Sequence, residues 1–207
     1  IMPGERRVAV TDQTCRKLVG RGLEVLIERG AGAGAHQSDE AYRAAGATLV
    51  DDAEQVYAEA DVIMKVKEPQ FSTAKGRSEV SMMRPGQVLV TFLHPASPSN
   101  HEMVRQLAAR GVTSLTLDSV PRISRAQTMD ALTSMSTVAG YKAVLAAADR
   151  LASFVPMVST AVGMLPPARV LVVGTGVAGL QALATAKRLG AVTVAADIRP
   201  AAREQAG

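Results

Sequence analysis

The sequence contains little of what several classes of function require. Cys15 is the one cysteine among 207 residues, so no internal disulfide can form, and we expect a reducing compartment and a buried thiol. Tryptophan is missing and aromatic residues make up 3%, while the 23 basic and 19 acidic residues are scattered along the chain. A nucleic-acid surface needs clustered basic side chains, so we expect no nucleic-acid partner. Metal-ligand spacings are missing too, and we predict no metal site.

Long apolar runs are also missing. The most apolar stretch, residues 143–165, is interrupted by Asp149, Arg150 and Pro156, whereas a membrane-spanning helix needs about 20 predominantly apolar residues. No N-terminal signal peptide is visible. We therefore expect a chain that does not itself enter a bilayer.

Over the first 123 residues, apolar runs of strand length alternate with helical patterns. This alternation predicts a parallel sheet with helices on both faces, and hence a complete α/β domain over residues 1–123. Residues 30–34 (GAGAG) lack phosphate-loop spacing, so we interpret them as a flexible connection between strand and helix. The predicted strands are 6–11, 24–28, 47–50, 61–66, 87–93 and 112–117, and the predicted helices are 12–20, 38–45, 53–60 and 99–110.

A long helix is predicted next. From Ser124 to about Phe154, alanines and apolar residues recur at helical spacing, and we expect Gly140 and Pro156 to interrupt or end the helix. We assign residues 124–165 to a segment that connects two α/β units. Such a helix would form one wall of the cleft between them, where cofactors commonly bind.

The start of a nucleotide-binding fold follows in residues 166–207. A β-branched strand over 169–173 leads into a glycine turn and a helix over 177–189, and a second strand covers 192–196. A full dinucleotide-binding fold needs about six strands, so we expect this second domain to be incomplete. The predicted fold class is α/β, with two Rossmann-like, doubly wound parallel-sheet domains joined by a long helix.

The glycine turn has the spacing GxGxxG. Gly174 permits the tight turn out of the strand, Gly176 lets a diphosphate approach bare backbone, and Gly179 lets the helix pack closely on the sheet. Thr175 and Val177 complete the loop, where the helix N-terminus offers free N–H groups and a positive dipole end. We predict that these five residues bind the phosphates of a dinucleotide.

Asp197 stands at the end of the second strand, where a carboxylate can accept hydrogen bonds from the ribose of an adenine nucleotide. A carboxylate there repels a 2′-phosphate, so we predict NAD(H) as the cofactor and not NADP(H). Ile198 and Arg199 are added to the predicted cofactor site. Arg199 has an alternative role, because an arginine beside this position can receive a 2′-phosphate.

A polar cluster precedes the long helix. If the predicted helix includes Gln127, Asp130 and Thr133, their spacing puts them on one face. With Arg122 just ahead, this face offers donors and acceptors suited to a carboxamide ring such as nicotinamide. A capping network, with Arg122 and Asp130 paired on the surface, explains the same residues equally well. Composition leaves both interpretations open.

Three stretches of the chain stand out as motifs: PRISRAQTMDALTS (121–134), AGYKAV (139–144) and GTGVAGLQALATAKRLGA (174–191). Together they resemble the NAD(H)-binding α subunit of proton-translocating nicotinamide nucleotide transhydrogenase. The resemblance covers nearly the whole chain. It implies a peripheral domain that passes hydride from NAD(H) to NADP(H) held by a partner domain, coupled to proton movement through membrane subunits. It also implies a homodimer located in the cytoplasm, peripheral at the inner membrane.

The same resemblance implies roles for the polar cluster. The Arg, Gln, Asp and hydroxyl residue of the family motif contact or position the nicotinamide end, and they fall on Arg122, Gln127, Asp130 and Thr133. Thr133 stands where the family usually has Ser. The hydroxyl is retained, and the added methyl narrows the site.

Alanine dehydrogenase is similar too, and it offers an alternative function. Arg7, Lys67 and His94 resemble residues that bind pyruvate or assist proton transfer in those enzymes. Lys and Arg would hold the carboxylate while His moves the proton that accompanies hydride transfer. The structural alternative is a surface pair of Lys67 with Glu68 and a histidine at a strand end. A third hypothesis is a module that senses NAD without catalysis.

Overall fold

The computed structural model describes residues 4–121 and 123–204. The chain forms two compact units, residues 1–121 and residues 122–207. Among the helices in the described ranges, none is both long and apolar enough to cross a membrane.

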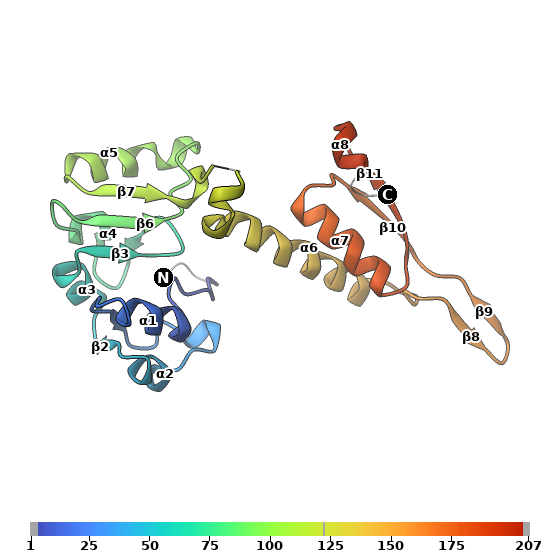
Figure 1. Cartoon of the computed structure of the whole chain (residues 1–207), viewed down its shortest axis with the longest axis horizontal. Coiled ribbons are helices and arrows are strands. Elements are labelled where there is room, and N and C mark those ends of the chain that lie inside the picture. Colours follow the sequence, from blue (N-terminus) through green and yellow to red (C-terminus); the bar gives the residue numbers. More distant parts are fainter. Residues whose placement is uncertain (1–3, 122, 205–207) are drawn as a thin grey trace. The chain divides into compact units, whose positions relative to one another are not determined.

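The first unit alternates short helices with short strands (Figure 1). Several helices begin at a capping side chain: Thr11, Ser38 and Asp52 each accept a hydrogen bond from a backbone N–H of the first turn. The α-helices are α1 (Asp12–Val19), α2 (Asp39–Ala44), α3 (Ala53–Glu59), α4 (Glu79–Met82) and α5 (His101–Ala109). The strands are β1 (Leu26–Glu28), β2 (Thr48–Val50), β3 (Val62–Met64), β4 (Phe71–Ser72), β5 (Arg77–Ser78), β6 (Val88–Thr91) and β7 (Thr113–Thr116), and short 3₁₀ turns are η1 (Ala33–Ala35), η2 (Pro98–Asn100) and η3 (Leu117–Ser119).

The longer strands of this unit pair in parallel, as the alternation predicts. β6 lies between β3 and β7, and β1 pairs with β2. Ile63 of β3 and Leu89 of β6 are in register, and both are buried in a core with Tyr57 of α3 and Leu107 of α5. The antiparallel hairpin β4–β5 is an element that the sequence pattern did not predict.

The strand predicted over residues 6–11 is wrong. This segment has no ladder partner among the described residues, and residues 9 and 10 form a bend. The Tyr42 hydroxyl donates a hydrogen bond to the Val10 carbonyl at 2.6 Å, and Val10 packs with Tyr42 and the fully buried Cys15 in a second core. The alternating apolar residues predicted burial correctly. The backbone of this segment is held by the Tyr42 side chain, however, and not by pairing with a neighbouring strand.

Residues 30–34 lie on the connection between β1 and α2, as predicted, and part of this connection is tightly packed. A Cβ added at Gly32 would lie 2.7 Å from Gln37 and Tyr42, and one at Gly34 would lie 3.1 Å from the backbone of Arg6. Gly32 and Gly34 are therefore needed for close packing, whereas Gly30 has open space around it.

The second unit is built on two helices and a pair of parallel strands (Figure 1). β10 and β11 pair in parallel over five residues each, and β8 and β9 form an antiparallel hairpin that the sequence pattern did not predict. The elements are η4 (Ser124–Met129), α6 (Ala131–Arg150), β8 (Val158–Thr160), β9 (Gly163–Leu165), β10 (Arg169–Val173), α7 (Val177–Arg188), β11 (Val192–Ala196) and α8 (Pro200–Glu204).

The long helix differs from its prediction at both ends. It begins at Ala131 instead of Ser124, because the preceding residues form the 3₁₀ helix η4 and the Asp130 side chain caps α6. It ends at Arg150 and not near residue 154, because Leu151 adopts an extended backbone. Gly140 does not interrupt it.

Gly140 instead allows α6 and α7 to pack closely. A Cβ at Gly140 would lie 2.1 Å from the Ala178 carbonyl oxygen in the first turn of α7. Only a residue without a side chain fits there. The apolar contacts of this layer include Val144 of α6 and Ala182 and Ala186 of α7. Gly140 thus sets where the start of α7 lies.

Candidate functional site

The glycine turn connects β10 to α7 in the conformation that its spacing predicts. Gly174 has a φ of +92°, a region that favours glycine, and its N–H donates to the Ala196 carbonyl of β11 at 2.7 Å. A Cβ at Gly179 would lie 1.8 Å from the Gly174 carbonyl oxygen, so this glycine permits close contact between helix and turn. A Cβ at Gly176 would meet no heavy atom within 4 Å. The middle glycine therefore faces open space.

The Asp197 carboxylate points back at this turn. Its Oδ2 accepts hydrogen bonds from the Thr175 backbone N–H at 2.7 Å and from the Thr175 hydroxyl at 3.1 Å. Arg199 donates to the same carboxylate from its backbone and its guanidinium. Hydrogen bonds from Arg199, first, and from Thr175 lower the pKa of Asp197, against a small effect of burial. The group is an anion at neutral pH.

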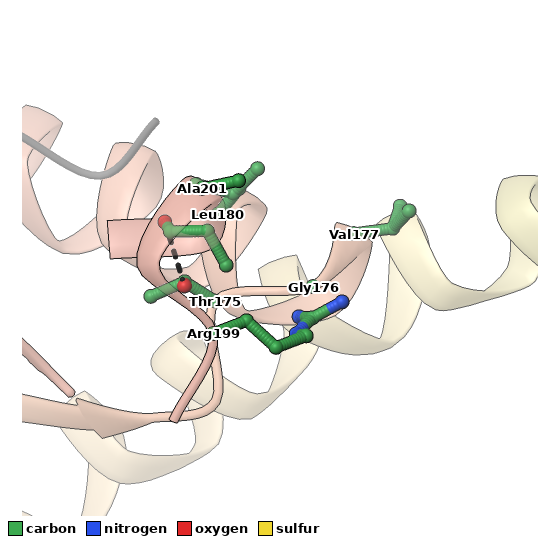
Figure 2. Close-up of a pocket in the computed structure, with 7 residues that line it drawn as sticks. Thr175, Gly176, Val177, Leu180, Arg199 and Ala201 are labelled. Carbon is green, nitrogen blue, oxygen red and sulfur yellow. Dashed lines mark hydrogen bonds between the residues drawn. The ribbon is translucent and has the colours of Figure 1, made fainter. Parts of the chain in front are cut away.

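An open hollow of about 330 Å³ lies over the turn. Figure 2 shows Arg199 beside the loop at Gly176, and the Thr175 side chain directed into the fold, where its hydroxyl donates to the Ala202 carbonyl at 2.9 Å. Of the predicted cofactor residues, four line the hollow and Ile198 is 95% exposed. The lining residues are Thr175, Gly176, Val177, Leu180, Arg199, Ala201 and Ala202.

The polar cluster is only partly assembled as predicted. Asp130 and Thr133 do meet: the Thr133 N–H donates to Asp130 Oδ1 at 2.9 Å and its hydroxyl donates to Oδ2 at 2.6 Å. Gln127 is exposed and belongs to η4, so the prediction of one shared helix face for these three residues is wrong. The physical reason is the Asp130 cap, which starts the α-helix after Gln127. Arg122 lies outside the described residues.

His94 of the first unit is held between two carboxylates. Its Nδ1 lies 3.1 Å from Glu68 Oε2 and its Nε2 lies 3.7 Å from Asp118 Oδ1. Backbone N–H groups of Leu93 and His94 donate to Asp118 Oδ2 at 2.9 and 2.8 Å, which holds His94 at a φ of 47°. Burial raises the pKa of Asp118, but hydrogen bonds from Thr116 and this backbone outweigh it, so the pKa is lowered.

Of the other two residues in the alanine-dehydrogenase comparison, Arg7 forms an ion pair, and Lys67 contributes only its charge near that pair. Arg7 is paired with Glu5 at 2.6 Å, and its hydrogen bond lowers the pKa of Glu5 to about 2, with a smaller contribution from the charge of Lys67. Glu68 pairs with His94, in place of the surface pair with Lys67 that the structural alternative proposed. Glu68 and Asp118 are site residues that the sequence analysis missed, although Glu68 directly follows Lys67.

Gly140 is the other missed residue. It makes room for the first turn of α7, on which the glycine loop depends, whereas its position inside a helical pattern indicated only an interruption. Residues 4–121 and 123–204 contain no cluster of His, Cys, Asp or Glu side chains that could hold a metal ion.

Comparisons with known proteins identify relatives over nearly the whole chain. Residues 1–139 match Alanine dehydrogenase/PNT, N-terminal domain, and residues 143–207 match Alanine dehydrogenase/PNT, C-terminal domain. An NAD(P) transhydrogenase alpha subunit of Rhodospirillum rubrum is 49% identical over 203 residues, which are 98% of this chain and 52% of that protein. The alanine dehydrogenase of Mycobacterium tuberculosis is 38% identical over 197 residues, 94% of this chain and 50% of that protein.

Solved structures of the same two kinds of protein are also similar to this chain. The crystal structure of transhydrogenase from Sinorhizobium meliloti has a TM-score of 0.89 at 43% identity, and covers 99% of this chain with 58% of its own. An L-alanine dehydrogenase has a TM-score of 0.83 at 30% identity, and covers 99% of this chain with 54% of its own. The chain spans about half the length of the curated relatives it matches. Its sequence and fold make it a member of the alanine dehydrogenase/PNT family.

Proposed function

We propose that this chain is the NAD(H)-binding part of a proton-translocating transhydrogenase, and that hydride passes between its NAD(H) and NADP(H) on a partner domain. One observation carries the proposal most directly: the Asp197 carboxylate is hydrogen-bonded to the backbone of the glycine turn, beside open space at Gly176. The higher identity to transhydrogenase subunits than to alanine dehydrogenases favours this interpretation within the family.

The residues present fit an adenine dinucleotide. The open space over Gly176 and the N-terminus of the 12-residue helix α7 suit a diphosphate, because backbone N–H groups and the helix dipole attract anions. The hollow of about 330 Å³ is within the size range of small-molecule sites. Gly174, Thr175, Gly176, Val177 and Gly179 would hold the diphosphate. Asp197 would hold the adenosine ribose, and its neighbours Ile198 and Arg199 lie at the same end of the proposed site.

The nicotinamide end is assigned to Arg122, Gln127, Asp130 and Thr133. Asp130 and Thr133 are held together by two hydrogen bonds, so the proton of the Thr133 hydroxyl is already donated. That hydroxyl can therefore only accept a hydrogen bond, which suits the N–H₂ group of a carboxamide.

The task of this chain is positioning. Bound NAD(H) supplies the hydride chemistry, so no side chain has to act as nucleophile or base. The protein holds one nicotinamide ring where a second can approach it, and orientation of that kind lowers a reaction barrier by itself. The proposal further includes a homodimer, and membrane and NADP(H)-binding partner subunits that keep the chain in the cytoplasm at the inner membrane.

The decisive experiment mixes the full-length protein with the NADP(H)-binding partner and follows reduction of an NAD analogue by NADPH. We expect turnover that requires both proteins and that falls sharply in Asp197→Ala. The exposed His101→Ala, on α5 of the first unit, is the matched control and should keep full activity. Absence of partner-dependent turnover in the wild-type protein rejects the proposal.

Alanine-dehydrogenase activity is the second candidate, and the ordered His94 favours it. Its ring lies between Glu68 and Asp118, an arrangement that can hold and release a proton. This candidate predicts NADH oxidation with pyruvate and ammonium, without a second protein. If His94→Ala leaves partner-dependent hydride transfer intact and no pyruvate reduction is found in the wild type, the second candidate is excluded.

A further inference from the structure

The Asp197 carboxylate already accepts hydrogen bonds at the positions that ribose hydroxyls would need. Oδ2 accepts from the Thr175 N–H at 2.7 Å, the Thr175 hydroxyl at 3.1 Å and Arg199 Nη2 at 3.1 Å. Oδ1 accepts from the Arg199 backbone N–H at 2.9 Å and from Arg199 Nε at 3.1 Å. A carboxylate has about four lone-pair sites. The Thr175 hydroxyl divides its single proton between Oδ2 and the Ala202 carbonyl, whereas the other four donors are full N–H groups. With these donors already on the carboxylate, two ribose hydroxyls can bind only by replacing some of them.

The five donors differ in how firmly the fold holds them. Thr175 is buried and also tied to the Ala202 carbonyl, and the Arg199 N–H belongs to the backbone, so these three donors stay in place. The guanidinium is different: the Arg199 side chain is 62% exposed, whereas that of Asp197 is 5% exposed. An exposed ion pair is weak because water solvates the freed charge. The guanidinium is therefore the donor that can leave.

The guanidinium and a ribose also present the same chemistry to Asp197. Nε and Nη2 form a fork of two N–H donors, one to each carboxylate oxygen. The 2′- and 3′-hydroxyls of a ribose are likewise two neighbouring donors. We propose that the Arg199 side chain is a built-in competitor of the cofactor ribose, which must displace it from Asp197, and that Arg199 thereby sets the affinity for NADH.

This inference rests on the proposed function, and it gives Arg199 opposite effects on two cofactors. With NADH, the guanidinium has to be moved before the hydroxyls can bind, so Arg199 weakens binding. The 2′-phosphate of NADPH has no proton to give to Asp197 at neutral pH but is attracted to a guanidinium. Arg199 therefore reduces the preference for NADH over NADPH that Asp197 provides.

The test compares the full-length wild type with Arg199→Met, which removes the fork and keeps the apolar stem and the backbone N–H. Titration with NADH should give a dissociation constant about threefold to fivefold lower in the variant, the size of one exposed ion pair. The affinity for NADPH should stay the same or fall. AMP should show the same gain as NADH, whereas 2′,3′-dideoxy-AMP, which has no ribose hydroxyls, should show none.

A matched control separates competition from general attraction of charge. Arg203 is exposed on α8 and does not line the hollow, so Arg203→Met removes the same charge nearby without touching Asp197. Loss of a positive charge by itself weakens binding of an anionic nucleotide, so Arg203→Met should bind NADH equally or more weakly. Tighter binding of NADH by Arg199→Met could therefore not be explained by the loss of a positive charge alone.

The outcomes distinguish the two proposals. If wild-type protein binds NADH and Arg199→Met binds it equally or more weakly, competition is overturned and the proposed cofactor site stands. A gain for dideoxy-AMP, or the same gain in Arg203→Met, also overturns competition. If the wild type binds no NADH at all, the proposed function itself fails.

Discussion

Replacing Gly140 by alanine should separate the two helices on which the candidate site is built. The added Cβ would lie 2.1 Å from the Ala178 carbonyl oxygen, and ordinary contact begins at 3.4 Å. The helices must therefore move apart by about 1.3 Å, because the opposing atom is backbone and cannot rotate away. Ala178 lies in the first turn of α7, so the glycine turn moves with it.

The size of the effect follows from two opposing contributions. Overpacking costs about 1–3 kcal/mol, and a contact between two backbones belongs at the upper end. Alanine stabilises the interior of a helix by about 1 kcal/mol relative to glycine. The net loss in the free energy of unfolding should be about 2 kcal/mol, which lowers the urea midpoint by roughly 1 M.

Urea unfolding of the full-length protein measures this loss, and NADH titration of the same samples should show weaker binding. Ala146→Gly is the matched control, because Ala146 is exposed on the same helix and reports the alanine-glycine difference without any clash. A Gly140→Ala protein that is as stable as the wild type, or more stable, would refute the close crossing of α6 and α7.

Three further predictions concern single side chains. Gly176→Ala should change the free energy of unfolding by less than about 0.5 kcal/mol, because the new methyl meets no protein atom within 4 Å. It should nevertheless weaken NADH binding about tenfold or more, because the methyl blocks the diphosphate. Urea unfolding and NADH titration measure the two effects, and unchanged NADH binding would contradict the prediction. Asp197→Ala should weaken NADH binding much more than Thr133→Ala, since hydrogen bonds to a charged group are the stronger kind, and the opposite order in titrations would contradict the ribose assignment. Asp118 has a pKa below its unfolded value of 3.8, so its stabilisation is present above about pH 4 and is lost as the pH falls through the lowered pKa; Asp118→Asn should therefore flatten the loss of stability below about pH 4, and an unchanged slope there would count against this carboxylate.

The glycine turn is the part of the site that local sequence predicted in most detail. Gly174 needs a positive φ and Gly179 touches the turn it follows, and both demands act over a few residues. The parallel pairing of β10 with β11 follows from the same short unit. Asp130 shows the limit of such reasoning: its spacing to Thr133 is correct, but whether it starts a helix or lies within one depends on which hydrogen bonds compete at that point.

The sequence by itself therefore determined the α/β alternation, the strand-turn-helix unit of residues 169–197 and the carboxylate at its end, because periodicity, glycine conformation and capping act between near neighbours. Only the tertiary structure decided that Gly140 admits the start of α7, that Tyr42 anchors residue 10 without a strand, and that the Arg199 guanidinium covers Asp197. Each of these depends on which distant or flexible groups come into contact in the folded chain, and a local sequence pattern does not show which groups do so.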